Sequence, residues 1–286
     1  MLRVAVPNKG SLSGPAVQLL GEAGFQINRR CKELTAVDEE NKVTFNFLRA
    51  PDIARHVGTG TLDVGITGQD LVAEVGTTKE VTELLRLNFG VARFCFAAPR
   101  GTYRVIGDLD GKTVATSYSR LVERAADDAG IRLEIAELDG AVEIAVELGL
   151  ADAVADLVET GASLRATGME IVGEPVLRSE AILVRGRNRL SPDREHKIEH
   201  LMSRLQGIVL ARNHVVIEYN CPTDVLEIAA KIASGTESPT IARLSDERWV
   251  AVRVMVKQTD AQTIMDQLWS VGARAIFSHP IESCRL

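Results

Sequence analysis

The stretch Ala151–Leu164 constrains the fold of this chain more than any other. Its first half alternates small or apolar residues with Asp152 and Asp156, and its β-branched content predicts a buried strand. Its second half carries glycine and hydroxyl groups and leads into a helix, with the residues Glu159, Thr160, Gly161, Ala162, Ser163 and Leu164. A chain organised around this unit is expected to belong to the α/β class.

Such a strand-turn-helix unit suits a phosphate group. The turn exposes several backbone N–H groups in one place, where an anion is stabilised. An acidic side chain just before the turn can bind sugar hydroxyls or a magnesium ion that accompanies phosphates. The alternative is structural, with Thr160 and Ser163 only capping the helix. The spacing alone leaves both interpretations open.

Bulk properties argue against several classes of protein. At 286 residues the chain is long enough for two or three domains. Its net charge of −6 argues against broad affinity for nucleic acid or anionic membranes, and no apolar stretch is long enough for a signal peptide or a membrane span. The four cysteines form no CxxC pair, so we expect reduced thiols in a cytoplasmic protein without a zinc site: Cys31, Cys95, Cys221 and Cys284.

Three further charged residues stand at predicted strand ends. Lys9 follows the predicted strand Leu2–Pro7, and Arg49 follows the predicted strand Val43–Leu48. Open α/β sheets bind ligands at the carboxyl ends of their strands, so both cations are candidates to meet an anion. Asp70 closes a strand-to-helix turn, where it either favours the helix dipole or accepts a hydrogen bond from a ligand. Taken singly, such a lysine or arginine is more often a solvated surface residue than a ligand contact.

A short internal repeat suggests two similar lobes. The first copy consists of a helix, Gly60, the triplet Leu62–Val64, a strand and a glycine turn. The second copy consists of a helix, Gly149, the triplet Ala151–Ala153, a strand and a glycine turn. Two lobes built on this unit would face each other across a cleft.

The expected elements divide the chain into three parts. Residues 1–90 and 176–206 are expected to form lobe I, and residues 91–175 to form lobe II with the glycine turn. Residues 207–286 are expected to form a separate domain.

The second half of the chain supplies the details of this division. Val176–Val184 predicts one long strand that returns to lobe I, and Asp193–Leu205 predicts a charged amphipathic helix. From the predicted strand Ile208–Tyr219 onward, the order β-α-β-β-α-β is that of a ferredoxin-like unit.

A signature runs through the glycine turn with the spacing E-x5-G-x-A-x2-V-x-D-L-x2-T-G-x-T-L. It resembles the signature of the ATP phosphoribosyltransferase family in its long form, and the residues that fit are Glu143, Gly149, Ala151, Val154, Asp156, Thr160, Gly161 and Leu164. Ser163 departs from the usual threonine but keeps the hydroxyl group. The motifs V-P-N-K-G, F-L-R, G-I-T-G-Q-D-L-V, D-G-A-V-E and E-S-P-T-I extend the resemblance over essentially the whole chain.

The resemblance implies a fold, a reaction and partners. It implies a two-lobed core like that of periplasmic binding proteins and a C-terminal regulatory domain that binds histidine. It implies transfer of the phosphoribosyl group of phosphoribosyl pyrophosphate to N1 of the adenine of ATP, with Mg²⁺, as the first step of histidine biosynthesis. Homodimers that assemble into hexamers are also expected.

Roles for single residues follow from this resemblance and from the chemistry of the side chains. The turn Glu159–Leu164 would hold the 5-phosphate, and Asp156, with Asp152, would face the ribose hydroxyls. Lys9 and Arg49 would meet phosphate charge. Asp70 and Glu143 are candidates for adenine or ribose contacts, with Glu143 also a candidate to take the proton shed from the adenine amine. The residues expected to bind histidine are Glu218, Ser238, Thr240 and Ala273.

Two rival functions are compatible with the same architecture. A solute-binding or ligand-sensing protein would typically carry a secretion signal or a helix-turn-helix domain, and would lack magnesium-dependent turnover. An inactive adaptor would not need the complete glycine turn together with Lys9, Arg49 and Asp70.

Overall fold

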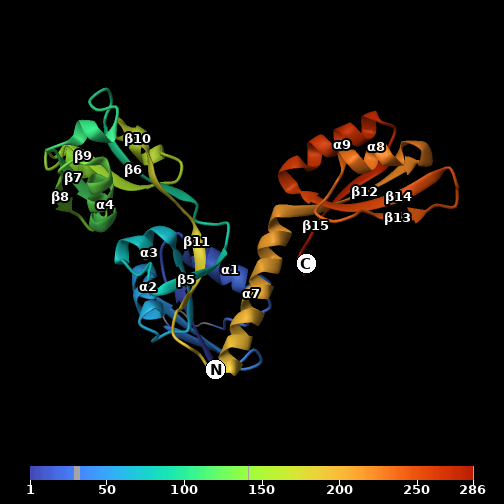
Figure 1. Ribbon diagram of the computed structural model, residues 1–286, viewed down its shortest axis with the longest axis horizontal. Helices are drawn as coiled ribbons and strands as arrows, with labels where there is room; N and C mark the ends of the chain where they lie inside the picture. The colour runs from blue at the N-terminus through green and yellow to red at the C-terminus, as the bar shows by residue number, and fades with distance from the viewer. Residues whose placement is uncertain (29–32, 141, 286) are drawn as a thin grey trace. The chain divides into compact units, whose positions relative to one another are not determined.

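The computed structural model describes residues 1–28, 33–140 and 142–285. Its contacts divide the chain into two compact units (Figure 1). The first unit contains Met1–Gly21 and Phe25–Met202, and the second contains Glu22–Gly24 and the residues from Ser203 on. The predicted division into lobes at residues 90/91, 175/176 and 206/207 stays a prediction.

The first sheet lies in the first unit and has the strand order β2-β3-β1-β4-β11-β5. Its strands are β1 (Leu2–Pro7), β2 (Thr35–Asp38), β3 (Val43–Leu48), β4 (Val64–Gly68), β5 (Val81–Arg86) and β11 (Ala181–Gly186). The central strands β1, β3 and β4 are parallel, and the outer pairings are antiparallel. The sequence pattern misses β2 and β5, because these edge strands are half exposed and carry little apolar alternation.

Three helices cover this sheet. Helices α2 (Ala50–Gly58) and α3 (Gln69–Val75) pack on one face, where Ile53 and Val57 meet Ala5 of β1. Helix α1 (Ser13–Glu22) lies on the other face (Figure 1).

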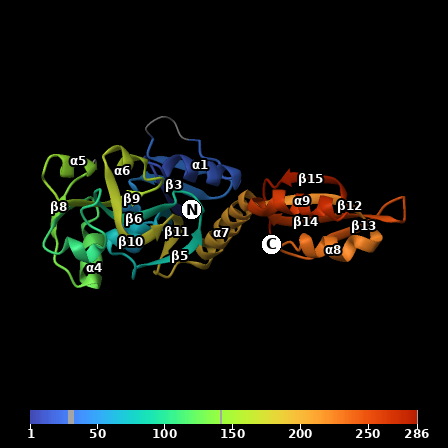
Figure 2. The same ribbon diagram turned by 90° about the horizontal axis from the view of Figure 1, so that it is seen from above.

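The second sheet has the order β10-β6-β9-β7-β8. Its strands are β6 (Ala92–Pro99), β7 (Thr113–Thr116), β8 (Glu134–Glu137), β9 (Ala153–Val158) and β10 (Met169–Ser179), and the 3-10 helix η1 is Ile106–Leu109. Helix α4 (Ser119–Ala129) packs on one face, and the short helices α5 (Glu143–Glu147) and α6 (Ala162–Ala166) lie on the other (Figure 2). The sequence predicts a helix over Ala141–Leu148 here, and its first residue lies outside the described residues.

Two short segments join the sheets, residues 87–91 and Glu180. The single long strand expected over Val176–Val184 is wrong: β10 ends at Ser179 in the second sheet, and β11 begins at Ala181 in the first. The interruption is a change of sheet, which an unbroken apolar run cannot reveal. The two segments also contact each other, since the N–H of Asn88 donates to the carboxylate of Glu180 at 3.0 Å.

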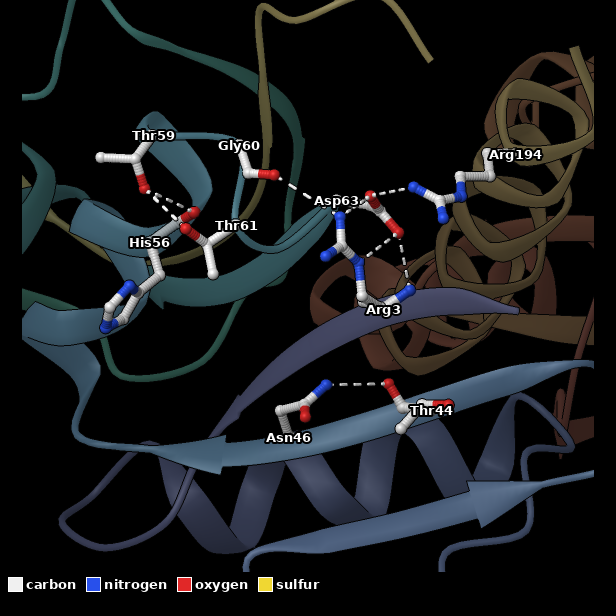
Figure 3. A network of polar contacts seen from close by, with 9 residues as sticks. All are labelled: Arg3, Thr44, Asn46, His56, Thr59, Gly60, Thr61, Asp63 and Arg194. Atoms are coloured by element: carbon white, nitrogen blue, oxygen red, sulfur yellow. Dashed lines mark hydrogen bonds and ion pairs between the residues drawn. The ribbon is translucent and has the colours of Figure 1, made fainter. Parts of the chain in front are cut away.

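Polar contacts anchor the start of helix α7 (Pro192–Asn213) to the first sheet. The buried carboxylate of Asp63 accepts from the backbone N–H of Arg3 at 2.8 Å and lies 3.0 Å from Nη2 of Arg3 and 3.2 Å from Nη1 of Arg194 (Figure 3). Arg185 donates to both carboxylate oxygens of Glu195 at 2.6 and 2.8 Å. The ion pairs Asp63–Arg194 and Arg185–Glu195 hold the first turn of α7 against the residue before β4 and against β11.

The C-terminal sheet has the order β13-β14-β12-β15, with both helices on one face (Figure 1). Its elements are β12 (His214–Pro222), η2 (Thr223–Val225), α8 (Leu226–Ile232), β13 (Thr240–Arg243), β14 (Trp249–Lys257), η3 (Gln258–Asp260), α9 (Ala261–Ser270) and β15 (Arg274–Pro280). This β-α-β-β-α-β order and strand arrangement confirm the ferredoxin-like unit.

The strand expected to begin at Ile208 is wrong in its first six residues, which belong to α7. Buried residues recur at helical spacing along α7, at Ile198, Leu201, Leu205, Ile208 and Ala211. The period of about 3.6 therefore continues past Leu205. The β-branched pair Val215 and Val216 follows so closely that the two patterns merge in the sequence.

Candidate functional site

A cavity of about 460 Å³ lies where strands of the first two sheets end. Its lining comes from the segments that follow β1, β3, β4, β7 and β9, so it gathers the carboxyl ends of strands from both sheets. Open α/β sheets place ligands at such ends.

The cavity brings together seven of the residues expected at a site: Lys9, Asp70, Glu159, Thr160, Gly161, Ala162 and Ser163. Lys9 is exposed and forms no ion pair with any described residue. Arg49 is exposed beside Ala50, which lines the cavity, but Arg49 itself is not part of the lining.

The turn after β9 has one capping contact and exposed hydroxyl groups. Gly161 occupies the N-cap position of α6 with φ = 71°, and the hydroxyl of Thr160 accepts from the N–H of Ala162 at 3.4 Å. The N–H groups of a helical first turn have no acceptor within the helix. The side chains of Thr160 and Ser163 are exposed and line the cavity, whereas Leu164 is buried in the core. The turn therefore combines the structural cap with hydroxyl groups that can face a ligand.

Asp70 has a different environment. It is 4% exposed, and its Oδ1 accepts from the hydroxyl of Ser179 at 2.6 Å while its Oδ2 accepts from the hydroxyl of Tyr118 at 3.2 Å. Burial raises the pKa of Asp70, although these hydrogen bonds oppose the rise. Because Tyr118 and Ser179 belong to the second sheet, Asp70 joins the two halves of the cavity wall.

A second contact joins the same two halves. The carboxylate of Glu74 in α3 accepts from the backbone N–H groups of Arg120 and Leu121 at 3.2 and 3.0 Å. Arg120 in turn donates to the carbonyl of Val75 at 3.0 Å. Glu74, from a helix that covers the first sheet, thus caps helix α4, which covers the second sheet.

The structure does not bring Asp152 to the cavity. Asp152 precedes β9, at the end of the strand opposite the glycine turn, and its carboxylate accepts from the N–H of Thr113 at 3.0 Å. Six strand residues separate Asp152 from Glu159, which corresponds to roughly 20 Å. In this geometry the carboxylate of Asp152 helps to fix the register of β9 against β7, and its expected contact with ribose stays a prediction.

Asp156 and Glu143 are not part of the cavity lining, but the charges of Glu143 and of the cavity residue Asp70 act on Asp156. Burial raises the pKa of Asp156, and the nearby charges of Glu143 and Asp70 raise it further. The N–H of Leu157 donates to Asp156 at 2.7 Å. Within the described residues, no group of three His, Cys, Asp or Glu side chains is placed to hold a metal ion.

Sequence reasoning missed Tyr118, which lines the cavity, and Ser179, which donates a hydrogen bond to the cavity residue Asp70. Tyr118 lines the cavity, and its ring packs against Phe94 with the centroids 5.4 Å apart. Burial raises its pKa, as does the charge of Asp70. Its position two residues beyond β7 is the same kind of strand-end signal that singled out Lys9. Ser179 carried no comparable signal, because its strand end was not recognised.

A smaller cavity of about 260 Å³ lies on the C-terminal sheet. Of the residues expected to bind histidine, Glu218 and Thr240 line it, whereas Ser238 and Ala273 do not. Glu218 accepts from Arg253 at 2.6 Å. Ala273 is fully buried between the helices and the sheet, so its side chain is unavailable to a ligand there.

Comparison with known proteins identifies the family. A sequence profile described as ATP phosphoribosyltransferase matches residues 49–207, and one described as the C-terminal domain of HisG matches residues 211–283. The ATP phosphoribosyltransferases of Streptomyces avermitilis and Streptomyces coelicolor are 50% and 49% identical to this chain, each over the full length of both proteins. The chain belongs to the ATP phosphoribosyltransferase family. It is therefore an enzyme, a transferase, as the sequence motifs predicted.

One solved structure supports the fold independently. The ATP phosphoribosyl transferase (HisG:HisZ) complex from Thermotoga maritima matches with a TM-score of 0.63 and 23% identity, over 72% of this chain and 99% of that chain. The predicted two-lobed α/β core is thus confirmed. Among the described residues, no helix has the length and apolar character needed to cross a bilayer.

Proposed function

We propose that this enzyme transfers the phosphoribosyl group of phosphoribosyl pyrophosphate to N1 of ATP, releasing pyrophosphate, as the first step of histidine biosynthesis in the cytoplasm. One observation carries the proposal: Lys9, Asp70 and the turn Glu159–Ser163, far apart in the sequence, line one cavity in a chain of this family. The volume of about 460 Å³ is within the usual range for small-molecule sites.

The turn after β9 holds the 5-phosphate. The N–H groups around Gly161 and the hydroxyls of Thr160 and Ser163 supply donors, and all three residues line the cavity. Gly161 has no side chain to block close approach of the phosphate to the backbone.

Lys9 and Arg49 stabilise the pyrophosphate. Displacement at the anomeric carbon leaves negative charge on the leaving group, and a nearby cation stabilises that charge. The position of Lys9 in the cavity lining, in the segment after β1, supports this role. Arg49, exposed beside Ala50, reaches the same region when substrate is bound.

Magnesium fits this chain as an ion carried by the pyrophosphate. Mg²⁺ is usually held by one or two carboxylates together with substrate phosphates, and Asp156 with Glu143 is the pair of carboxylates that would meet it. When bound, it neutralises charge on the leaving group. Asp156 also faces the ribose hydroxyls in this proposal, without Asp152.

ATP is positioned rather than chemically activated, because N1 of adenine already carries a lone pair. Tyr118 lines the cavity, and its bond to Asp70 fixes the orientation of its ring. Glu143 remains the candidate to take the proton of the adenine amine.

A direct assay tests the proposal. The purified chain is incubated with ATP, phosphoribosyl pyrophosphate and magnesium, and the ultraviolet absorbance of adenine is followed with pyrophosphate release. The proposed activity gives both signals in equal amounts, and omission of either substrate abolishes both. Absence of turnover with intact binding of the sugar phosphate would favour a ligand-sensing protein instead.

We further propose that histidine inhibits the enzyme by binding the C-terminal sheet, and that the chain assembles into homodimers and hexamers. The cavity lined by Glu218 and Thr240 supports the first part, since a carboxylate can accept from the ligand's ammonium group. Glu218→Ala should raise the inhibitory histidine concentration at least about tenfold, a usual loss for a charge-assisted hydrogen bond, without changing uninhibited turnover. Glu282→Ala is the matched control, and sedimentation velocity reads the assembly state.

A further inference from the structure

A second cavity shares the glycine turn with the proposed donor site. It has a volume of about 390 Å³ and is lined by Thr160 and Gly161, which also line the larger cavity, and by Arg93, Arg100 and Arg165. Three guanidinium groups in one cavity are unusual in a chain whose net charge is −6. Arginine is suited to planar, bidentate recognition of phosphate.

These arginines have no carboxylate partners. Among the described residues, none of Arg93, Arg100 and Arg165 takes part in an ion pair, although the lining also contains Glu170. The carboxylate of Glu170 instead accepts from the backbone N–H of Gly101 at 2.9 Å. The positive charge of the cavity is therefore not compensated from within the protein.

A fourth arginine adds to the same imbalance. Arg178 of β10 is directly opposite Arg93 of β6 in the antiparallel ladder, so both side chains leave the same face of the sheet. Like charges directly opposite each other destabilise a strand pair. Both charges act on the thiol of Cys95 and lower its pKa, against the larger effect of burial. An anion bound at this face would relieve the repulsion.

We propose that the arginine cavity is a second anion site that takes a small phosphate-bearing ligand while the donor site is occupied. Arg93 and Arg100 bind the anion, and Leu164, Met169 and Ile171 provide an apolar floor for the rest of the ligand.

Arg165 connects this site to the glycine turn. Its Nη1 donates to the carbonyl of Thr160 at 3.0 Å. A bound anion competes for that guanidinium, so the hydrogen bond to the turn weakens and affinity for the phosphoribosyl donor falls. This coupling rests on the proposed function, whereas the binding itself does not.

Calorimetry tests the binding. The full chain, saturated with phosphoribosyl pyrophosphate and magnesium in the absence of ATP, is titrated with inorganic pyrophosphate. We expect one further site, and we expect the R93Q/R100Q variant to bind at that site at least about tenfold more weakly, because each lost charge-assisted hydrogen bond costs that much. R104Q, which removes an arginine outside the cavity, is the matched control. The single change R100E, at an exposed position, covers the case in which the double variant fails to fold.

Three outcomes overturn the proposal. The first is that the saturated wild-type chain binds no pyrophosphate. The second is that the R93Q/R100Q and R100E variants bind pyrophosphate as the wild type does. The third is that these variants change the sedimentation coefficient, which would assign the arginines to a contact between copies. Failure of the chain to bind the phosphoribosyl donor would defeat the proposed function. The pyrophosphate titration, compared between the wild type and the arginine variants, would still show whether Arg93 and Arg100 bind an anion.

The coupling has its own readout. Bound pyrophosphate should raise the apparent KM for the donor in a wild-type chain more than simple competition predicts, and R165Q should abolish that excess. Purely competitive inhibition in both chains would contradict the link through Arg165.

Discussion

The repeated units that end in β4 and β9 share a scaffold and differ in their turns. Asp63 and Asp152 hold equivalent positions, since each accepts from the N–H at the start of the neighbouring parallel strand, that of Arg3 at 2.8 Å and that of Thr113 at 3.0 Å. The preceding glycines Gly60 and Gly149 have similar positive φ values of 76° and 70°. The internal repeat seen in the sequence is therefore a structural repeat.

The turns that follow differ in how their polar groups are satisfied. After β4, the carboxylate of Asp70 is buried and bonded to Ser179 and Tyr118. After β9, Thr160 and Ser163 are exposed, and the hydroxyl of Thr160 accepts from the N–H of Ala162 at 3.4 Å. The first turn joins the two sheets through a buried carboxylate, and the second carries exposed hydroxyl groups at the cavity. Under the proposed function, the same supersecondary unit serves structure in one place and binding in the other.

The largest expected effect is a loss of stability on changing Asp63, compared with the equivalent Asp152 of the second repeat. Asp63→Asn should lower the free energy of unfolding by about 3 kcal/mol, because it leaves Arg3 and Arg194 without their buried partner. Asp152→Asn, at the equivalent but exposed position, should cost about 1 kcal/mol. Urea denaturation measures both. A selective rise of the donor KM in Asp152→Asn would return that residue to the binding site.

The next effect separates backbone strain from ligand binding. Gly161→Val should raise the KM for phosphoribosyl pyrophosphate about 100-fold, since the side chain displaces the phosphate. Gly149→Val places the same residue at nearly the same φ, in open space away from the cavity. Both variants should lose similar stability, and steady-state kinetics should show the KM effect in Gly161→Val only. Equal KM values would remove the turn from the site.

Removal of cavity cations should have a smaller effect. Lys9→Gln should raise the KM for phosphoribosyl pyrophosphate at least about tenfold, which is the usual loss for a charge-assisted contact. Arg49→Glu should do the same if this exposed residue meets the phosphates. Lys79→Gln is the control on the same lobe. Wild-type kinetics in Arg49→Glu would assign that residue to the surface.

The smallest effect depends on pH. Burial, with the charges of Glu143 and Asp70, raises the pKa of Asp156 above its ordinary value of 3.8. The folded chain therefore holds this proton more tightly than the unfolded chain, and the resulting stability is lost as pH rises through the raised pKa. Asp156→Asn should raise Tm near neutral pH and not below pH 3.8. An equal shift at both pH values, as expected for the exposed Asp128→Asn, would refute this origin.

The sequence predicts most of this fold because its strands alternate clearly and its turns carry glycine. It fails where tertiary context decides. The break at Glu180 is a change of sheet, and the strand expected from Ile208 is the end of a helix. The sequence could not show that Asp152 lies outside the cavity lining, because an acidic residue near a glycine turn looks like a ligand residue at either end of the strand. Tyr118 was missed because its partner Asp70 is distant in the sequence.

The central claim is that the turn after β9 binds the sugar phosphate and the turn after β4 does not. A crystal structure with phosphoribosyl pyrophosphate and magnesium tests it most directly. The account predicts the 5-phosphate on the backbone N–H groups of Gly161, Ala162 and Ser163, with the bonds of Asp70 to Ser179 and Tyr118 intact. A 5-phosphate bound at the Asp70 turn, with Gly161 free of ligand, would contradict it.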